Sequence, residues 1–376
     1  MALCGSKHFQ PILDASKQFL KACSEFGFKN NSDFNGTDQE GFGQYQVNIK
    51  NGKRFSAADA FLKPILNRPN LDILTNTLVE KIITSNKKVI GVKISNKKFS
   101  GVIGCSSELI LSGGSINSPQ ILMLSGIGPK NHLKKYQISQ VHDLPGVGQN
   151  LQDHLTVNLS YKINELKTFS ELMKPFAMVK NLYEYFFKNT GLMTYPASDI
   201  GVFFKTNSNE KTPNAQIHFA PGAGEYKKNG AMKPSSGITA SICNLRPESR
   251  GYIELQSSDP NIAPKIFANY LTEEKDIKHM IEGVNKIREV FNTTIMKNLG
   301  ATEIQPGSIY QTDNEIDEFI RNESLSVYHP IGTCKMGNGT ECVVDQDLRV
   351  KGIRAVSYTH LRAHETRGNL VCRLLL

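Results

Sequence analysis

The 376-residue chain has the composition of a globular protein, because 39% of its residues are hydrophobic, 21% are charged and the mean hydropathy is -0.32. Its length predicts two domains or one large α/β body. No apolar run approaches the roughly 18 residues that a membrane-spanning helix needs, and the net charge of +9 comes from scattered lysines such as Lys87-Lys88 rather than from a basic stripe. We therefore expect neither a nucleic-acid nor a membrane partner.

The first part of the chain alternates helical and β patterns. Residues 9–26 place apolar side chains at helical spacing and end before Gly27, which predicts an amphipathic helix. The runs Leu71–Ile83 and Val89–Ile94 are rich in β-branched residues and are joined by a polar turn. A hairpin is the natural interpretation.

A strand, a glycine turn and a helix follow. Glu108–Leu111 predicts a buried strand that enters the turn Ser112–Ser115, and Ser118 followed by Pro119 is typical of an N-cap and first helical residue. Free N–H groups at such a helix N-terminus could face an anionic cofactor. Ordinary packing of a strand against a helix is the alternative.

The second half of the chain mixes strands with two helices. Strand patterns occur at Gln216–Ala220, Ile238–Leu245 and Gly251–Leu255, and helical patterns at Thr272–Met296 and Glu315–Arg321. The predicted fold class is therefore α/β (α+β).

Several common functional motifs are missing from the sequence. The Gly-x-Gly pairs, such as Gly146/Gly148, lack the third glycine of a dinucleotide-binding fingerprint, and the Ser-centred G-x-S-x-G elbow of hydrolases does not occur. The seven cysteines form no C-x-x-C pair, so we expect no metal site. Cys334 and Cys342 could form a disulfide or remain two reduced thiols.

Longer stretches carry a family resemblance. Gly114–Gly128 resembles the second signature of glucose-methanol-choline (GMC) oxidoreductases at every constrained position. Further matches to this family occur in the expected order, at Asn51–Arg54, Ala60–Leu62, Gly148–His154, Arg246–Gly251, Asp259-Pro260, Asn269–Leu271 and Tyr328–Gly337. The chain is identified as a member of this family over roughly residues 10–354. The sequences of its motifs are most similar to those of arthropod glucose-dehydrogenase-like members.

The resemblance implies an architecture and an activity. Residues 1–160 would form the remaining part of an incomplete FAD-binding, Rossmann-like domain, and residues 161–325 a substrate-binding domain with an antiparallel sheet backed by helices. Residues 326–354 would return to the FAD domain. The activity would be that of an FAD-dependent oxidoreductase acting on the CH-OH group of an alcohol or sugar, with oxygen or a quinone as the electron acceptor.

One histidine corresponds to the catalytic position of the family. His329 would accept the proton of the substrate hydroxyl while hydride passes to the flavin N5, a task that suits an imidazole with a pKa near 6.5. His154 corresponds to a family position to which we assign a structural role, through hydrogen bonds near Asp153.

The resemblance also implies cofactor contacts. Val79 would lie against the adenine end of FAD, and the turn that contains Ser112, Gly113 and Asn117 beside its diphosphate and ribitol. Asn117 could equally be only a turn residue. Thr333 and Cys334 would follow the catalytic histidine back toward the flavin.

Both ends of the sequence depart from the family pattern. The opening glycine fingerprint would lie upstream of Met1. After Ile353 the family would continue to a strand and a second catalytic histidine or asparagine, whereas Ala355–Leu376 resembles translated sequencing-adapter read-through or, alternatively, a divergent C-terminus. We therefore expect a fragment that by itself binds no FAD stably and shows no turnover.

Other functions remain open at this stage. A lyase of the hydroxynitrile-lyase type would use the same fold and a similar histidine, and a secreted binding protein without catalysis is a third possibility. The segment Ile163–Gly224 is expected to line part of the substrate pocket. Six Asn-x-Ser/Thr sites are compatible with secretion, namely Asn30, Asn35, Asn158, Asn292, Asn322 and Asn338.

Overall fold

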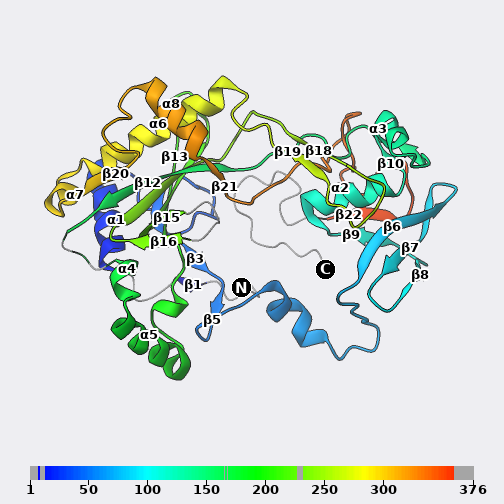
Figure 1. Ribbon diagram of the computed structural model, residues 1–376, viewed down its shortest axis with the longest axis horizontal. Coiled ribbons are helices and arrows are strands. Elements are labelled where there is room, and N and C mark those ends of the chain that lie inside the picture. Colours follow the sequence, from blue (N-terminus) through cyan, green and yellow to red (C-terminus); the bar gives the residue numbers. More distant parts are fainter. Residues whose placement is uncertain (1–6, 9–12, 165, 167, 227–231, 360–376) are drawn as a thin grey trace. The chain divides into compact units, whose positions relative to one another are not determined.

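A computed structural model describes residues 7–8, 13–164, 166, 168–226 and 232–359 of the chain (Figure 1). The chain divides into two compact units, each assembled from three stretches. Unit 1 comprises Met1–Leu71, Leu155–Arg246 and Glu274–Leu325, and unit 2 comprises Asp72–His154, Pro247–Glu273 and Ser326–Leu376. The N-terminal stretch Met1–Leu71 thus belongs to unit 1, together with most of residues 161–325. From the sequence we expected it in the FAD-binding part of the chain, residues 1–160. The mixed α/β class and the antiparallel sheet backed by helices are confirmed.

An antiparallel sheet of seven strands forms the centre of unit 1. The strands follow the order β2-β13-β14-β17-β12-β20, and β21 also pairs with β12. Their bounds are Gly41–Gln44 (β2), Ile200–Phe204 (β13), Ala215–Ala220 (β14), Ile238–Asn244 (β17), Leu155–Lys162 (β12), Thr302–Gln305 (β20) and Leu325–Ser326 (β21). Ile242 of β17 lies opposite Ile217 of β14 and Val157 of β12, so apolar side chains meet across the sheet.

Helices cover one face of this sheet. They are α1 (Asp14–Phe26), α6 (Glu274–Phe291), α7 (Thr294–Asn298) and α8 (Asp313–Glu323). Phe19 of α1 stacks on Phe219 with 4.1 Å between ring centroids, and Phe291 of α6 stacks on Tyr161 at 3.6 Å. A Cβ atom placed at Gly283 of α6 would lie 2.4 Å from the side chain of Ile242, so this glycine permits the close approach of α6 to the sheet.

Smaller elements complete unit 1. They are β1 (Lys7–His8), β3 (Gln46–Val47), β4 (Ile49–Lys50), β5 (Lys53–Arg54), η1 (Ala58–Leu62), η2 (Lys63–Ile65), α4 (Phe169–Leu172), α5 (Pro175–Lys188), η3 (Leu192–Thr194), β15 (Ala223–Tyr226) and β16 (Met232–Ser235). Among the described residues, no helix has the length and apolar character needed to cross a membrane.

Unit 2 combines a three-stranded antiparallel sheet with a short parallel pair. The sheet contains β6 (Leu78–Ser85), β7 (Lys88–Ser95) and β8 (Ser100–Gly104), and β6 packs against α2 (Gly114–Leu124). The parallel pair is β9 (Leu109–Leu111) with β22 (Val356–Tyr358). The other elements are β10 (Ile127–Gly128), α3 (Lys130–Lys135), β11 (His142–Asp143), β18 (Tyr252–Glu254) and β19 (Lys265–Phe267).

The helices show where local patterns were sufficient and where they were not. The helix expected over residues 9–26 is α1 as far as it is described, and Gly27 ends it in the left-handed conformation, with φ of 101°. The helix expected over Thr272–Met296 is instead divided into α6 and α7. The backbone N–H groups of Thr294 and Ile295 at the start of α7 donate to the carboxylate of Glu25, so a side chain from α1 caps the second helix.

Three further expectations concern unit 2 and the end of the chain. The hairpin of β6 and β7 is present, although it begins at Leu78 rather than at Leu71. Cys334 and Cys342 are both free thiols. Residues 356–358 lie within the segment expected to be a tail, yet they form β22, and Val356 and Tyr358 are buried. The remainder, which includes His360, His364 and Cys372, lies outside the described residues.

Candidate active site

Asp153 is the central hydrogen-bond acceptor of a polar cluster in unit 2. Its buried carboxylate accepts the backbone N–H groups of His154 at 2.9 Å and of His329 at 2.8 Å on Oδ1. The hydroxyls of Tyr270, at 2.6 Å, and of Ser326 donate to Oδ2. Four donors therefore surround one buried carboxylate, which is the arrangement that makes a buried charge tolerable.

The segment that carries His329 is held against the residues around Asp153. Gln152 and Ile331 exchange backbone hydrogen bonds of 3.0 and 2.8 Å, and the N–H of Val327 donates to the carbonyl of His154 at 3.1 Å. Tyr328, just before His329, has a φ of 58°, which is rare for a bulky residue. Its N–H donates to Ser326 Oγ at 2.8 Å, so the network around Asp153 stabilises this sharp turn.

The imidazole of His329 lies beside that of His154. The ring centroids are 5.6 Å apart and the rings meet edge to face, with an interplanar angle of 67°. Both side chains are half-buried. Asp153 thus fixes the backbones of two neighbouring histidines, one of which is the predicted catalytic residue.

The N-terminal turn of α2 joins this cluster through Ser115. The Ser115 hydroxyl donates to the carbonyl of Pro330, and the Thr333 hydroxyl donates to the carbonyl of Ser115. The N–H of Gly148 in turn donates to the carbonyl of Thr333 at 3.0 Å. The predicted catalytic segment and the glycine turn are therefore adjacent in one unit.

Proline inside α2 explains the bond to Thr333. The sequence predicted that α2 begins at Pro119 with Ser118 as N-cap, but the helix begins at Gly114 with Gly113 as N-cap. Proline has no N–H, so Pro119 leaves the carbonyl of Ser115, four residues earlier, without its helical partner. Thr333, which is fully buried, supplies the missing donor.

The N-terminal end of α2 has the features of an anion-binding site. Gly113 makes no side-chain cap hydrogen bond, Gly114 has a positive φ of 75°, and Ser112, Gly113 and Asn117 are exposed. The hydroxyl of Ser118 is buried and has no hydrogen-bond partner among the described residues. Uncapped N–H groups at the positive end of a helix dipole suit a phosphate, so these residues fit the diphosphate of a dinucleotide cofactor.

The remaining predicted cofactor residues lie in different surroundings. Val79 lies on β6, the strand that packs against α2, and Thr333 contacts Ser115 as described. The thiol of Cys334 is buried in the apolar core of unit 2, and this burial raises its pKa. Its contact with a cofactor therefore stays a prediction from the resemblance.

Tyr270 shows how the environment of Asp153 affects a neighbouring acid. Partial burial of Tyr270, followed by its hydrogen bond to the Asp153 carboxylate, raises the pKa of its phenol to about 12. Loss of the phenol proton would leave two negative oxygens facing each other. Tyr270 therefore remains a hydrogen-bond donor to Asp153 at neutral pH.

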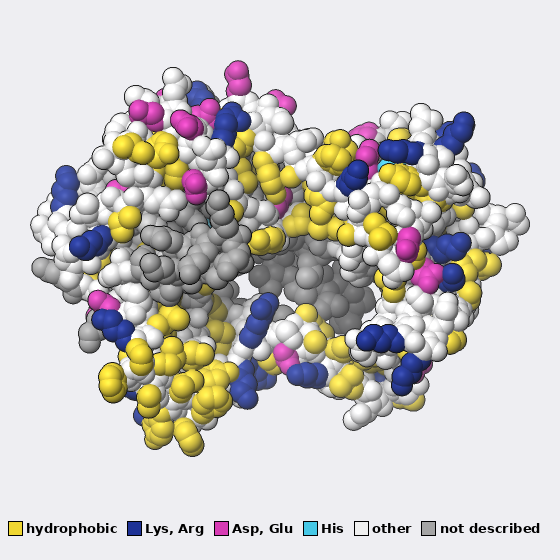
Figure 2. All heavy atoms as spheres, viewed as in Figure 1, with side chains coloured by type: hydrophobic (Ala, Val, Ile, Leu, Met, Phe, Trp, Pro, Cys, Tyr) yellow, Lys and Arg dark blue, Asp and Glu magenta, His cyan; other side chains and the backbone are white. Residues whose placement is uncertain are grey.

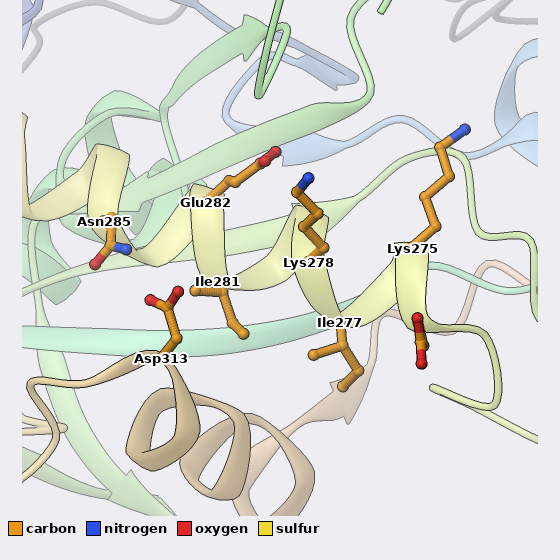
Figure 3. A pocket seen from close by; sticks show the side chains of 8 residues that line it. Lys275, Ile277, Lys278, Ile281, Glu282, Asn285 and Asp313 are labelled. Carbon is orange, nitrogen blue, oxygen red and sulfur yellow. The ribbon is translucent and has the colours of Figure 1, made fainter. Parts of the chain in front are cut away.

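An open groove of about 550 Å³ lies on unit 1 (Figure 3). Its walls are α6 and the start of α8, and it is lined by Glu274, Lys275, Ile277, Lys278, Ile281, Glu282, Asn285 and Asp313. In Figure 3, Ile277 and Ile281 point toward α8, whereas Lys275, Lys278 and Glu282 point away from it. No predicted site residue lines this groove. Nowhere in the described part of the chain do three or more His, Cys, Asp or Glu side chains form a group that could hold a metal ion.

Sequence reasoning missed the residues that organise the site. The sequence identified Asp153 only as a neighbour of His154, Ser115 only as part of a glycine turn and a family motif, and Tyr270 only as part of a family motif. The motif Gly148–His154 could have indicated the role of Asp153. It contains no lysine or arginine, so the Asp153 carboxylate has to accept hydrogen bonds from other donors.

Comparisons with known proteins identify the family. Two sequence profiles, both described as GMC oxidoreductase, match residues 5–156 and 247–357. An alcohol dehydrogenase [acceptor] of Pseudomonas putida is 40% identical over 95% of this chain, and an oxygen-dependent choline dehydrogenase of Brucella anthropi is 38% identical over 97%. The chain spans 64% of the first relative and 66% of the second. These relatives are bacterial, and they give no support to the arthropod glucose-dehydrogenase subtype.

Solved structures share the fold. An FAD-dependent oxidoreductase from Chaetomium thermophilum gives a TM-score of 0.87 at 23% identity, covering 97% of this chain and 70% of its own. Formate oxidase of Aspergillus oryzae gives 0.85 at 21% identity, covering 94% and 67%. With the profile matches and the relatives above, these findings show that the chain belongs to the GMC oxidoreductase family, a family of FAD-dependent enzymes.

Proposed function

We propose that this chain carries the proton-accepting part of an FAD-dependent enzyme that oxidises an alcohol, with His329 as the base. The observation that carries the proposal is the single hydrogen-bonded cluster that holds both His329 and the uncapped N-terminus of α2. FAD, when bound, would accept a hydride from the carbon that bears the hydroxyl. The name of the Pseudomonas relative, and that of the choline dehydrogenases, support an alcohol as the substrate.

The protein residues have separate tasks in this proposal. His329 would accept the hydroxyl proton on an imidazole nitrogen, because a neutral imidazole has the right basicity near pH 7. Asp153 is a positioning residue, since it binds the backbone N–H of His329 rather than the ring. Ser115 would hold the end of α2 against the histidine segment, and the exposed N–H groups near Gly113 would bind the cofactor phosphates.

The choice of electron acceptor and substrate is part of the proposal. Oxygen or a quinone remains the proposed acceptor, and the two relatives named above represent an acceptor-linked and an oxygen-dependent dehydrogenase. We propose an uncharged primary alcohol or choline as the first substrates to be tried. That the 376-residue chain alone fails to bind FAD or to turn over stays a prediction from the sequence.

Flavin spectroscopy tests the proposal directly. Titration of the purified 376-residue chain with FAD tests the expectation that it binds no FAD stably. Bleaching of the flavin absorbance is followed, without oxygen after addition of each alcohol, in a longer form of the protein that binds FAD. Replacing His329 by Ala should lower the rate of bleaching about 10²–10⁴-fold while leaving FAD affinity within about threefold. An unchanged rate in His329→Ala would remove the histidine from the mechanism. Product formation without any flavin bleaching would favour the lyase alternative.

A further inference from the structure

Helix α5 turns its apolar side away from unit 1. Phe176, Val179, Tyr183, Phe186 and Phe187 recur at helical spacing, and their exposed fractions range from 54% to 95%. A surface helix normally buries such a stripe against the core. Figure 2 shows hydrophobic side chains gathered over the lobe where Figure 1 places α5.

The polar side of α5 fixes this orientation. Asn181 is the buried residue of the helix, and its side-chain amide donates to the carbonyl of Leu172 in α4 at 2.7 Å. At the C-terminus, Asn189 adopts the left-handed conformation and its N–H donates to the carbonyl of Glu184. Rotating the aromatic stripe inward would therefore break the contact between Asn181 and α4.

Basic side chains border the exposed aromatic stripe. Lys180 and Lys188 lie on α5 and Lys174 is its N-cap, and all three are exposed. The one acidic residue of the helix, Glu184, is 3.9 Å from Lys180. The ammonium of Lys188 lies 5.6 Å from the ring centroid of Tyr183. The helix thus combines aromatic residues with an excess of positive charge.

The hairpin of β4 and β5 adds to this charge. A Cβ atom placed at Gly52 in its turn would lie 2.4 Å from the carbonyl oxygen of Asn189, so the hairpin reaches the C-terminal end of α5. Lys50, Lys53 and Arg54 are all exposed on this hairpin. No acidic residue interrupts the stretch from Lys50 to Arg54.

We propose that the exposed face of α5, with the basic hairpin beside it, docks this protein on an anionic phospholipid bilayer. Aromatic residues on one side of a helix and lysines at its border are the pattern of helices that lie in the membrane interface. The 14 residues of α5 extend about 21 Å, less than the roughly 30 Å of a bilayer core, so the helix lies along the surface. We expected no membrane partner because the sequence contains no apolar run long enough to span a bilayer. Binding along the surface does not need such a run. The proposal is independent of the proposed activity.

Vesicle flotation tests the docking. The 376-residue protein is mixed with vesicles of phosphatidylcholine alone or of phosphatidylcholine with 30% phosphatidylglycerol, and the floating fraction is measured over a range of salt. We expect binding to the anionic vesicles that weakens as salt rises, because added ions screen the lysines. Binding to neutral vesicles should be weaker.

Two sets of variants separate the apolar and the charged contributions. Replacing Phe186 and Phe187 together by Ser should weaken binding to anionic vesicles at least about tenfold, because two exposed rings that would enter the bilayer are lost. Replacing Lys53 and Lys188 by Gln should weaken it about fivefold per lysine on anionic vesicles and leave neutral vesicles unaffected. Ile309→Ser is the matched control, because Ile309 is 69% exposed in unit 1 outside α5.

Three outcomes would overturn the proposal. The first is failure of the wild-type protein to float with anionic vesicles, and the second is equal flotation of the Phe186→Ser/Phe187→Ser variant. The third is a dimer in sedimentation equilibrium that the same variant converts to monomer, which would assign the face to a second copy of the chain. Circular dichroism and thermal melting of every variant verify the fold, which these substitutions at exposed positions should leave unchanged.

Discussion

The hydrogen bond from Thr333 to the Ser115 carbonyl should stabilise the folded protein only because residue 119 is proline. Thr333→Val keeps the shape of the side chain and removes the hydroxyl, so a buried carbonyl loses the donor that Pro119 cannot provide. An unsatisfied buried polar group costs about 1–3 kcal/mol. In a Pro119→Ala background the new N–H of residue 119 can bond to the same carbonyl, and Thr333→Val should then cost less than about 1 kcal/mol.

Urea unfolding of the four proteins in this double-mutant cycle, followed by circular dichroism, measures the coupling. We expect an interaction free energy of about 1–2 kcal/mol between the two positions. Thr156→Val is the control, because its buried hydroxyl also donates to a carbonyl, that of Ile242 at 2.8 Å. Its cost should be the same with proline or alanine at position 119. Equal costs of Thr333→Val in both backgrounds would refute the reasoning.

Two further predictions concern the cluster around Asp153. Asp153→Ala should lower the free energy of unfolding by about 3–5 kcal/mol, because it leaves several donors unpaired in a buried site. Asp259→Ala is the control and should lower it by less than about 1 kcal/mol, because it removes an exposed carboxylate with only local hydrogen bonds. Equal thermal melting of the two variants would contradict this. Because the folded-state pKa of Tyr270 is about 12, above its ordinary value of 10, its contribution to stability is complete below pH 10 and is lost as pH rises through 12. Tyr270→Phe should therefore flatten the fall in urea midpoint between pH 10 and 12, and an unchanged slope would exclude this role.

Local patterns in the sequence predicted those parts of the fold that depend on neighbouring residues. The hairpin of β6 and β7 is one example, because its turn residues Asn86 and Lys87 both have positive φ and join strands of equal length. The start of α2 could not be predicted in this way. Proline usually occupies the first turn of a helix, and only Thr333, which lies 218 positions beyond Ser115 in the chain, makes an internal proline acceptable here.

The candidate site was predictable in its residues but not in its organisation. His329 and the turn at Ser112–Asn117 were found through family motifs, while the connection between them runs through Ser115 and Asp153. Similarly, the apolar stripe of α5 is visible in the sequence, but its outward direction depends on the contact of Asn181 with Leu172. Such contacts are tertiary, and no local preference encodes them.

The hydrogen bonds of Asp153 also constrain the order in which the chain can fold. Tyr270 lies 117 residues and Ser326 173 residues further along the chain, and the intervening stretches belong mostly to unit 1. Closing such long loops is slow unless the intervening chain has already become compact. During synthesis, the strands and helices of unit 1 would therefore assemble first and shorten the loops, and the cluster that holds His329 would be completed only after Ser326 has emerged.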